Sequence, residues 1–215
     1  MTRRNGFATL VGLMLLVGTE VSAAPIPITN PGFEDPAMPD GAFTVGTITG
    51  WVVGTGAEQG VFNPTTGQIP VVPEGSQVGY SNGGSITQAL SANLTANTQY
   101  NLSVQVGHRS ECCGEPTFTI ELLAGATTLT SAPINYVLLT PGAPFITLNA
   151  PYFASPADAH LGEQLSIRLS SSGPQSDFDN VILDASTVGT RVPEPSTFLL
   201  LGSGMLALVV RSRRK

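Results

Sequence analysis

Apolar and polar residues alternate along several short segments of this 215-residue chain. In residues 99–107 the apolar Tyr100, Leu102, Val104 and Val106 are separated by polar residues. Successive side chains of a strand point to opposite faces of a sheet, so this period of two predicts strands with one buried face. The same alternation recurs in residues 117–123 and 164–170, and shorter strand candidates cover 44–53, 77–81, 85–90 and 145–150.

Residues 177–184 (DFDNVILD) are the last strand candidate, although their apolar positions fall on both faces. Gly, Pro, Asn and Ser separate the candidates, and no segment between the two ends of the chain has a helical period. Many short strands with turns between them predict an all-β fold, an antiparallel two-sheet sandwich, over residues 24–186.

The amino terminus has the pattern of a secretory signal peptide. Arg3 and Arg4 precede an apolar run over residues 7–17, and small residues follow it. We therefore expect residues 1–23 to be a signal peptide helix that signal peptidase removes after Ala23. The alternative is an anchor helix that is not cleaved.

The carboxyl terminus has three parts. A linker over residues 187–195 ends in Pro193, Glu194 and Pro195, a hydrophobic helix is expected over 196–210, and residues 211–215 are basic. The apolar residues 198–210 would rise about 20 Å as a helix, against about 30 Å for the bilayer core. The tail is either a short membrane anchor with its basic residues in the cytoplasm or a sorting signal that is cut.

The order of these three parts resembles the PEP-CTERM sorting signal of Gram-negative bacteria. The resemblance implies that an exosortase processes the tail, with Pro193, Glu194 and Pro195 as recognition residues. It also implies export, first anchored in the inner membrane and then to the cell surface or extracellular matrix, in a species that makes exopolysaccharide or biofilm.

Charge is distributed unevenly. The exported part holds thirteen acidic but only three basic residues, a net charge of about −10. Such a surface repels phosphate backbones, so we expect no nucleic-acid partner. The two cysteines, Cys112 and Cys113, are adjacent. A vicinal disulfide, two buried thiols, a bridge to another chain and a weak metal site all stay open.

A second resemblance covers the exported part. Residues 30–36 (NPGFEDP), Gly50-Trp51 and residues 178–183 (FDNVIL) are similar to segments of jelly-roll carbohydrate-binding and galactose-binding-like modules. This implies a jelly roll and a structural Ca²⁺ site with Glu34 and Asp179 as carboxylate ligands, since calcium prefers oxygen donors. The alternative is that both carboxylates accept hydrogen bonds from backbone N–H groups in turns.

Three residues are candidates for ligand binding. Trp51 is the only tryptophan and offers a flat surface for a sugar ring, or else a core side chain. His108 and Arg109 lie in a polar loop after the clearest strand, where sandwiches often bind ligands, or else in a solvated loop.

No catalytic motif is present, and no long loop is expected to build a cleft. We therefore expect a protein that is not an enzyme, with a structural or adhesive role in exopolysaccharide or biofilm. The alternative is a carbohydrate-binding module with a specific glycan, and a polysaccharide-acting enzyme is a distant third.

Overall fold

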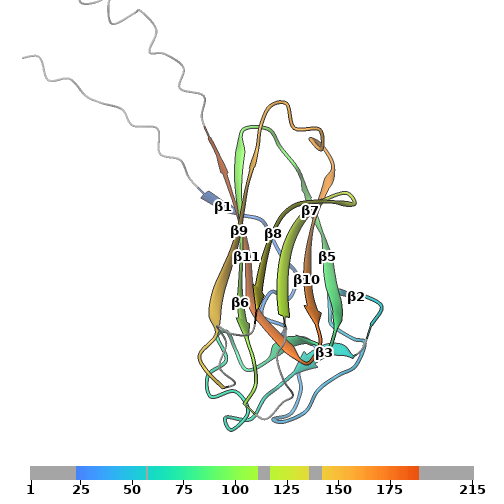
Figure 1. Cartoon of the computed structure of the whole chain (residues 1–215), viewed down its shortest axis with the longest axis vertical. Coiled ribbons are helices and arrows are strands. Elements are labelled where there is room, and N and C mark those ends of the chain that lie inside the picture. Colours follow the sequence, from blue (N-terminus) through green and yellow to red (C-terminus); the bar gives the residue numbers. More distant parts are fainter. Residues whose placement is uncertain (1–22, 57, 111–116, 136–141, 189–215) are drawn as a thin grey trace, which may run out of the picture.

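The computed structural model describes residues 23–56, 58–110, 117–135 and 142–188. In these residues the chain forms strands β1 to β11 without an α-helix, and the strands pair in two antiparallel sheets (Figure 1). This arrangement confirms the predicted all-β sandwich. The expected terminal helices, residues 1–23 and 196–210, lie outside the described residues apart from Ala23. In the part that is described, no helix is long and apolar enough to cross a membrane.

Sheet A carries the strands that matter most for the site. Its order is β3-β4-β11-β6-β9, and β1 also pairs with β11. The bounds are Gln59–Phe62 for β3, Val78–Ser81 for β4, Ser176–Thr187 for β11, Thr98–Gly107 for β6, Ile146–Ala154 for β9 and Ala23–Pro25 for β1.

Sheet B packs against sheet A and has the order β2-β5-β10-β7-β8. The bounds are Val52–Val53 for β2, Gly84–Asn93 for β5, Gln164–Ser172 for β10, Thr117–Ala124 for β7 and Thr127–Asn135 for β8.

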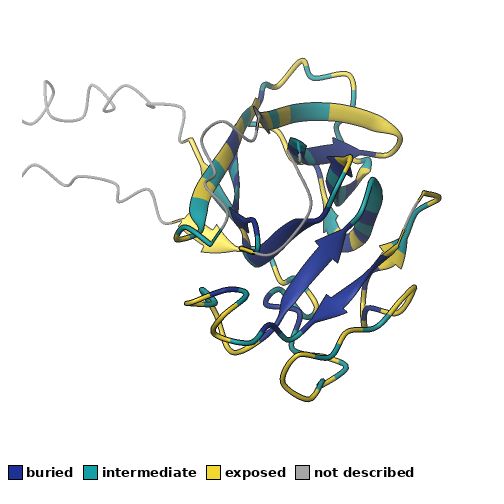
Figure 2. Cartoon of the chain, turned by 60° about the horizontal axis from the view of Figure 1, so that its bottom comes forward, coloured by how far each residue is buried: buried dark blue, intermediate teal, exposed yellow. Residues whose placement is uncertain are grey.

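The hydrophobic core lies between the two sheets and follows the alternation in the sequence. Along β6, Tyr100, Leu102, Val104 and Val106 point inward and are at most 1% exposed. Aromatic rings from both sheets meet in the core, because Phe118 of β7 and Phe178 of β11 pack edge to face with ring centroids 5.8 Å apart. Figure 2 shows the buried residues mainly in the strands, and exposed residues both in the loops and on parts of the outer strands.

Simple alternation would put the apolar residues of β11 on both faces of the sheet. A β-bulge explains why several of them nevertheless face the core. Phe178, Val181 and Leu183 all point into the core, although the first two are three positions apart. The pairing of β11 with β6 shifts register between Asp179 and Ile182. One extra residue in a strand reverses the facing of the residues after it, so the bulge restores the inward direction after Asp179.

The outer face of sheet A carries a second, smaller hydrophobic cluster. It contains the buried Phe62, Ile69, Val78 and Tyr80. Ile69 belongs to residues 63–77, the connection between β3 and β4, which folds back over this face. The connection therefore covers the β3–β4 end of the sheet and shields it from water.

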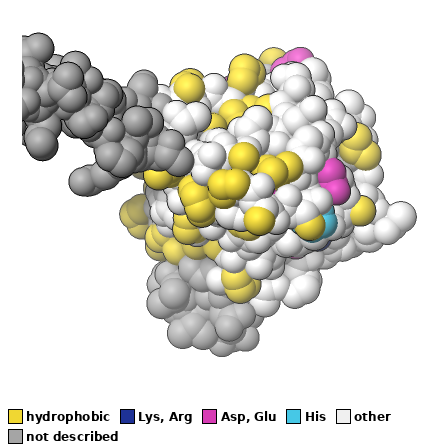
Figure 3. All heavy atoms as spheres, turned by 90° about the horizontal axis from the view of Figure 1, so that it is seen from above, with side chains coloured by type: hydrophobic (Ala, Val, Ile, Leu, Met, Phe, Trp, Pro, Cys, Tyr) yellow, Lys and Arg dark blue, Asp and Glu magenta, His cyan; other side chains and the backbone are white. Residues whose placement is uncertain are grey.

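The described ends of the chain lie side by side. Ala23 of β1 pairs with Ser186 of β11, and the Val188 N–H donates to the Asn97 carbonyl at 2.7 Å. This end of the sandwich is opposite β3 (Figure 1). Figure 3 looks onto it and shows hydrophobic side chains gathered there. Phe153 at the end of β9 and Val188 are 46% and 44% exposed.

Candidate functional site

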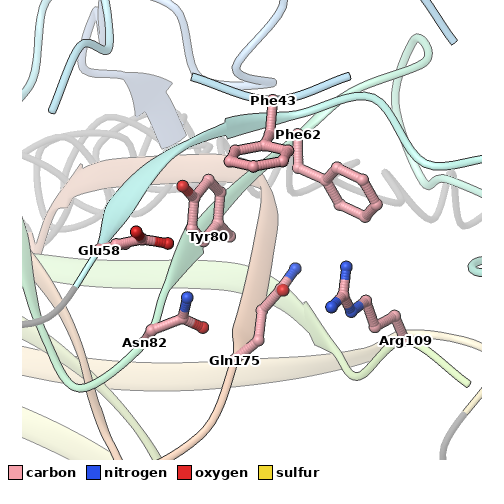
Figure 4. Close-up of a pocket in the computed structure, with 7 residues that line it drawn as sticks. All are labelled: Phe43, Glu58, Phe62, Tyr80, Asn82, Arg109 and Gln175. Carbon is pink, nitrogen blue, oxygen red and sulfur yellow. The ribbon is translucent and has the colours of Figure 1, made fainter. Parts of the chain in front are cut away.

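A pocket opens at the β3–β4 end of sheet A. Its empty volume is about 330 Å³, which includes space open to solvent. Three rings form one side, and four polar side chains face them (Figure 4). The lining residues are Phe43, Glu58, Phe62, Tyr80, Asn82, Arg109 and Gln175.

The aromatic side of the pocket is fixed by backbone pairing. The segment carrying Phe43 runs along β3, because the Thr44 N–H donates to the Val61 carbonyl at 2.8 Å. Gly60 permits this approach, since a side chain at that position would collide with the Thr44 backbone. Phe43 then packs edge to face on Tyr80 with centroids 6.3 Å apart.

Tyr80 is held as a neutral phenol. Its hydroxyl donates to the Thr44 carbonyl at 2.7 Å. Burial, together with the charge of Glu58, raises the pKa of Tyr80 to about 12. The ring therefore stays uncharged and presents a polarisable face to the pocket.

Arg109 supplies the positive charge on the polar side. Its guanidinium lies 5.5 Å from the centroid of Phe62, a cation–π contact that orients the side chain. Its Nε is buried and has no hydrogen-bond partner among the described residues. A buried N–H that lacks an acceptor in the protein is a position where a ligand or water completes the bonding.

Asp177 lies beside the pocket, on the outer face of sheet A. It pairs with Tyr80 of β4 and with Gly107 of β6, and its side chain is fully buried. The Gln175 amide donates to Oδ1 at 2.7 Å, whereas Oδ2 has no partner among the described residues. Gln175 also lines the pocket, so its amide lies between the cavity and this carboxyl group.

Burial sets the protonation of Asp177. Loss of water contact raises the pKa of Asp177 to about 7, although the Gln175 hydrogen bond and the Arg109 charge act in the opposite direction. A carboxyl group with a pKa near neutrality holds a proton that it can also release. The site therefore contains an acid suited to proton transfer.

Two features of the sequence place Asp177 there. Its neighbour Phe178 is anchored in the core, which turns Asp177 to the opposite face of the strand. Gly107, across from it on β6, leaves room for the Phe145 ring, which a side chain at position 107 would meet. Phe145 packs against the outer hydrophobic cluster.

A second group of acids lies farther along β11. Glu34 accepts hydrogen bonds from the Ser76 and Gln77 N–H groups, both at 2.8 Å. Asp179 accepts from Glu74 and Asn180 at 2.8 and 2.7 Å. These contacts are the ones expected if Glu34 and Asp179 accept hydrogen bonds from backbone N–H groups instead of binding calcium. Burial raises the pKa of Asp179 to about 7, and the charges of Glu74 and Glu34 add to the effect.

The predicted ligand-binding residues lie in different parts of the structure. Arg109 lines the pocket, and His108 beside it is buried. Trp51 is only 6% exposed, packs on Phe33 at 5.3 Å and donates to the Asn30 carbonyl at 3.2 Å, so it is a core residue with no flat face for a sugar. Cys112, Cys113 and the sorting residues Pro193, Glu194 and Pro195 lie outside the described residues.

The sequence did not reveal the pocket. Residues 63–77 cover the outer face and carry part of its hydrophobic cluster, but none of them lines the pocket. Asp177 and Gln175 were missed. The available indication was that Asp177 and Asp179 flank a core phenylalanine, which puts both carboxylates on one face.

The fold and the pocket define a β-sandwich protein with a partly aromatic pocket and a buried acid beside it. Residues 24–184 match the HpiC1-like family, described as HpiC1 cyclase, and the chain belongs to that family. The prediction that the protein is not an enzyme is therefore overturned. Its site is assembled from segments that are distant in sequence and form no continuous motif.

Solved structures of cyclases agree with this assignment. A cyclase from Fischerella sp. TAU is 30% identical, with 79% of this chain and 100% of that chain covered and a TM-score of 0.69. The Stig cyclase Fisc from the same organism, in complex with (3Z)-3-(1-methyl-2-pyrrolidinylidene)-3H-indole, is 29% identical, with 78% and 100% covered and a TM-score of 0.69. A search of the curated proteins finds no match.

The two predicted resemblances are confirmed. The tandem CBM22 domain of Paenibacillus barcinonensis Xyn10C has the same jelly-roll fold at 15% identity, with 82% of this chain and 50% of that chain covered and a TM-score of 0.52. Residues 191–215 match the PEP-CTERM sorting motif, which implies export and processing by an exosortase.

The raised pKa of Asp177 predicts a pH effect on stability. Its carboxyl group has a pKa near 3.8 in the unfolded chain and about 7 when folded, so its contribution to stability is full below about pH 4 and falls as the pH rises to 7. Asp177→Asn lacks this loss. We expect the free energy of unfolding of the wild type, measured with urea, to fall relative to that of Asp177→Asn as the pH rises from 4 to 7. Above pH 7 the difference should level off. A constant difference would contradict the burial argument.

Proposed function

We propose that this protein is an exported cyclase that closes a ring in a small unsaturated molecule, with Asp177 as the proton donor. Membership of the HpiC1-like family supports the reaction class. The observation that carries the proposal is the buried Asp177 carboxyl group, which has a pKa of about 7 next to an aromatic pocket.

The chemistry needs no second reactant. The protonated Asp177 gives its proton to one carbon of a carbon–carbon double bond, the π bond breaks, and the adjacent carbon becomes cationic. A second π bond of the same molecule attacks this carbon and closes the ring. Loss of a proton to the Asp177 carboxylate then restores the acid, so the product is an isomer of the substrate.

The pocket suits a cationic intermediate. Phe43, Phe62 and Tyr80 offer ring faces or edges around the cavity, and aromatic faces attract positive charge. Gln175 bonds to Asp177 and lines the cavity, so the ligand reaches the acid when it displaces the Gln175 amide. This displacement would also exclude water from the reacting carbon.

We also propose that the pocket faces away from the membrane while the protein is anchored. Asp177 lies near the start of β11 and Thr187 at its end, about 33 Å further on at the usual rise of a strand. The sorting motif follows β11 in the chain. Release to the cell surface or extracellular matrix would then leave the site open to substrates outside the cell.

Replacement of the acid tests the function. We expect Asp177→Asn to lower turnover by at least about 100-fold, because general acid catalysis supplies 10²–10⁴-fold. The matched control is Asp184→Asn, on the same strand but far from the pocket. Alkenyl indoles incubated in D₂O and analysed by mass spectrometry report cyclised isomers that carry deuterium on carbon. Equal turnover by Asp177→Asn and wild type would refute the assignment.

We propose separately that Glu34 and Asp179 hold a structural Ca²⁺. Carboxylate oxygens are donors that Ca²⁺ prefers, and Gly32 and Gly75 leave the space that the Glu74 and Glu34 side chains occupy. Within the described residues, no group of three or more His, Cys, Asp or Glu is placed to hold a metal ion. Backbone carbonyls or water would therefore have to complete the shell.

Chelation tests the calcium proposal. We expect EDTA to lower the melting temperature of the wild-type protein and added Ca²⁺ to restore it, since a ligand that binds only the folded state stabilises it. Glu34→Gln should lose most of this response, and Glu163→Gln, in the loop before β10, should keep it. A wild-type melting temperature that EDTA leaves unchanged would rule out the site.

A further inference from the structure

Arg109 is unusual among the basic residues of this acidic protein. Within the described residues, Arg109 and Arg168 are the Lys and Arg side chains. Arg168 lies on sheet B and donates to both oxygens of Glu121, at 2.5 and 2.8 Å, so its charge is already paired. No described carboxylate forms an ion pair with Arg109, whose side chain lines the pocket.

The surroundings of Arg109 favour an anionic group. The ring of Phe62 holds the guanidinium from one side at 5.5 Å, which leaves its planar edge for polar contacts. Its buried Nε lacks an acceptor, and the amide of Asn82 lines the same cavity as a further donor. A guanidinium binds a carboxylate through two parallel N–H···O bonds, which matches a planar donor edge beside an amide.

We propose that Arg109 binds a carboxylate of the substrate, so that the substrate is a small unsaturated aromatic acid. This inference rests on the proposed cyclase function, because it assigns the polar half of the same pocket. The hydrocarbon part would lie against Phe43, Phe62 and Tyr80, and the carboxylate would point to Arg109. A single charge is favoured over a phosphate, since Glu58 lines the pocket and repels additional negative charge.

A pair of matched probes tests the substrate class. One Fischerella sp. TAU cyclase structure contains 4-(1H-indol-3-yl)butan-2-one and is 30% identical to this chain, with 78% of this chain and 100% of that chain covered and a TM-score of 0.69. Its counterpart 3-(1H-indol-3-yl)propanoate has the same shape, with an anionic oxygen in place of a methyl group. We expect calorimetry at pH 7.5 to show the propanoate binding at least about tenfold more tightly to the wild-type protein.

Variants test whether Arg109 causes the preference for the propanoate over the ketone. Arg109→Met should remove the advantage of the propanoate over the ketone, whereas Arg109→Lys should keep part of it. Arg168→Met, which changes the paired arginine of sheet B, should behave as wild type. If Arg109 influenced binding only through its effect on Asp177, the preference for the propanoate over the ketone would disappear in Asp177→Asn. We expect this preference to persist in that variant.

Four results would overturn the proposal. The first is equal or weaker binding of the propanoate, and the second is a preference that survives in Arg109→Met. The third is competition by acetate as strong as by the propanoate, which would make Arg109 a general anion site. Absence of binding by both probes also counts against it. The deuterium test of Asp177 is independent, so a cyclase with a neutral substrate would lose this inference and retain its proposed function.

Discussion

The carboxyl group of Asp177 is shielded from water, and this constraint connects the fold to the chemistry. Burial favours the neutral acid, and the pKa of about 7 results from desolvation. The shielding depends on the outer hydrophobic cluster and on the connection between β3 and β4 that supplies part of it. An open outer face would expose the carboxyl group to solvent and return its pKa toward the ordinary range.

Strand β11 contributes both to the hydrophobic core and to the acidic residues of the outer face. Phe178 anchors the strand in the core, and Asp177 and Asp179 on either side of it reach the outer face. The bulge after Asp179 returns Val181 and Leu183 to the core, so the strand serves both faces without losing packing. The carboxyl end of the same strand, after which the sorting motif follows in the chain, lies at the opposite end of the sandwich from β3 and the pocket.

The sequence predicted the fold well because alternation and turn residues are local. Residues 99–107 and 164–170 show which side chains face the core, and β6 and β10 follow them. The PEP-CTERM motif was also readable, since its three parts are contiguous. The pocket was not, because Phe43, Tyr80, Arg109 and Gln175 come from four separated segments. The protonation of Asp177 depends on burial in three dimensions, which no local pattern reports.

The central claim is that Asp177 is a carboxylic acid that titrates near neutrality. Carbon-13 NMR of the side-chain carboxyl groups, followed from pH 3 to 9, measures this directly. Asp179→Asn distinguishes the two buried aspartates of β11, and Asp177→Asn confirms the assignment. The account predicts that the Asp177 resonance titrates with a midpoint of about 7. A midpoint near the ordinary value of 3.8 would show that water reaches the carboxyl group and would contradict its role as the proton donor.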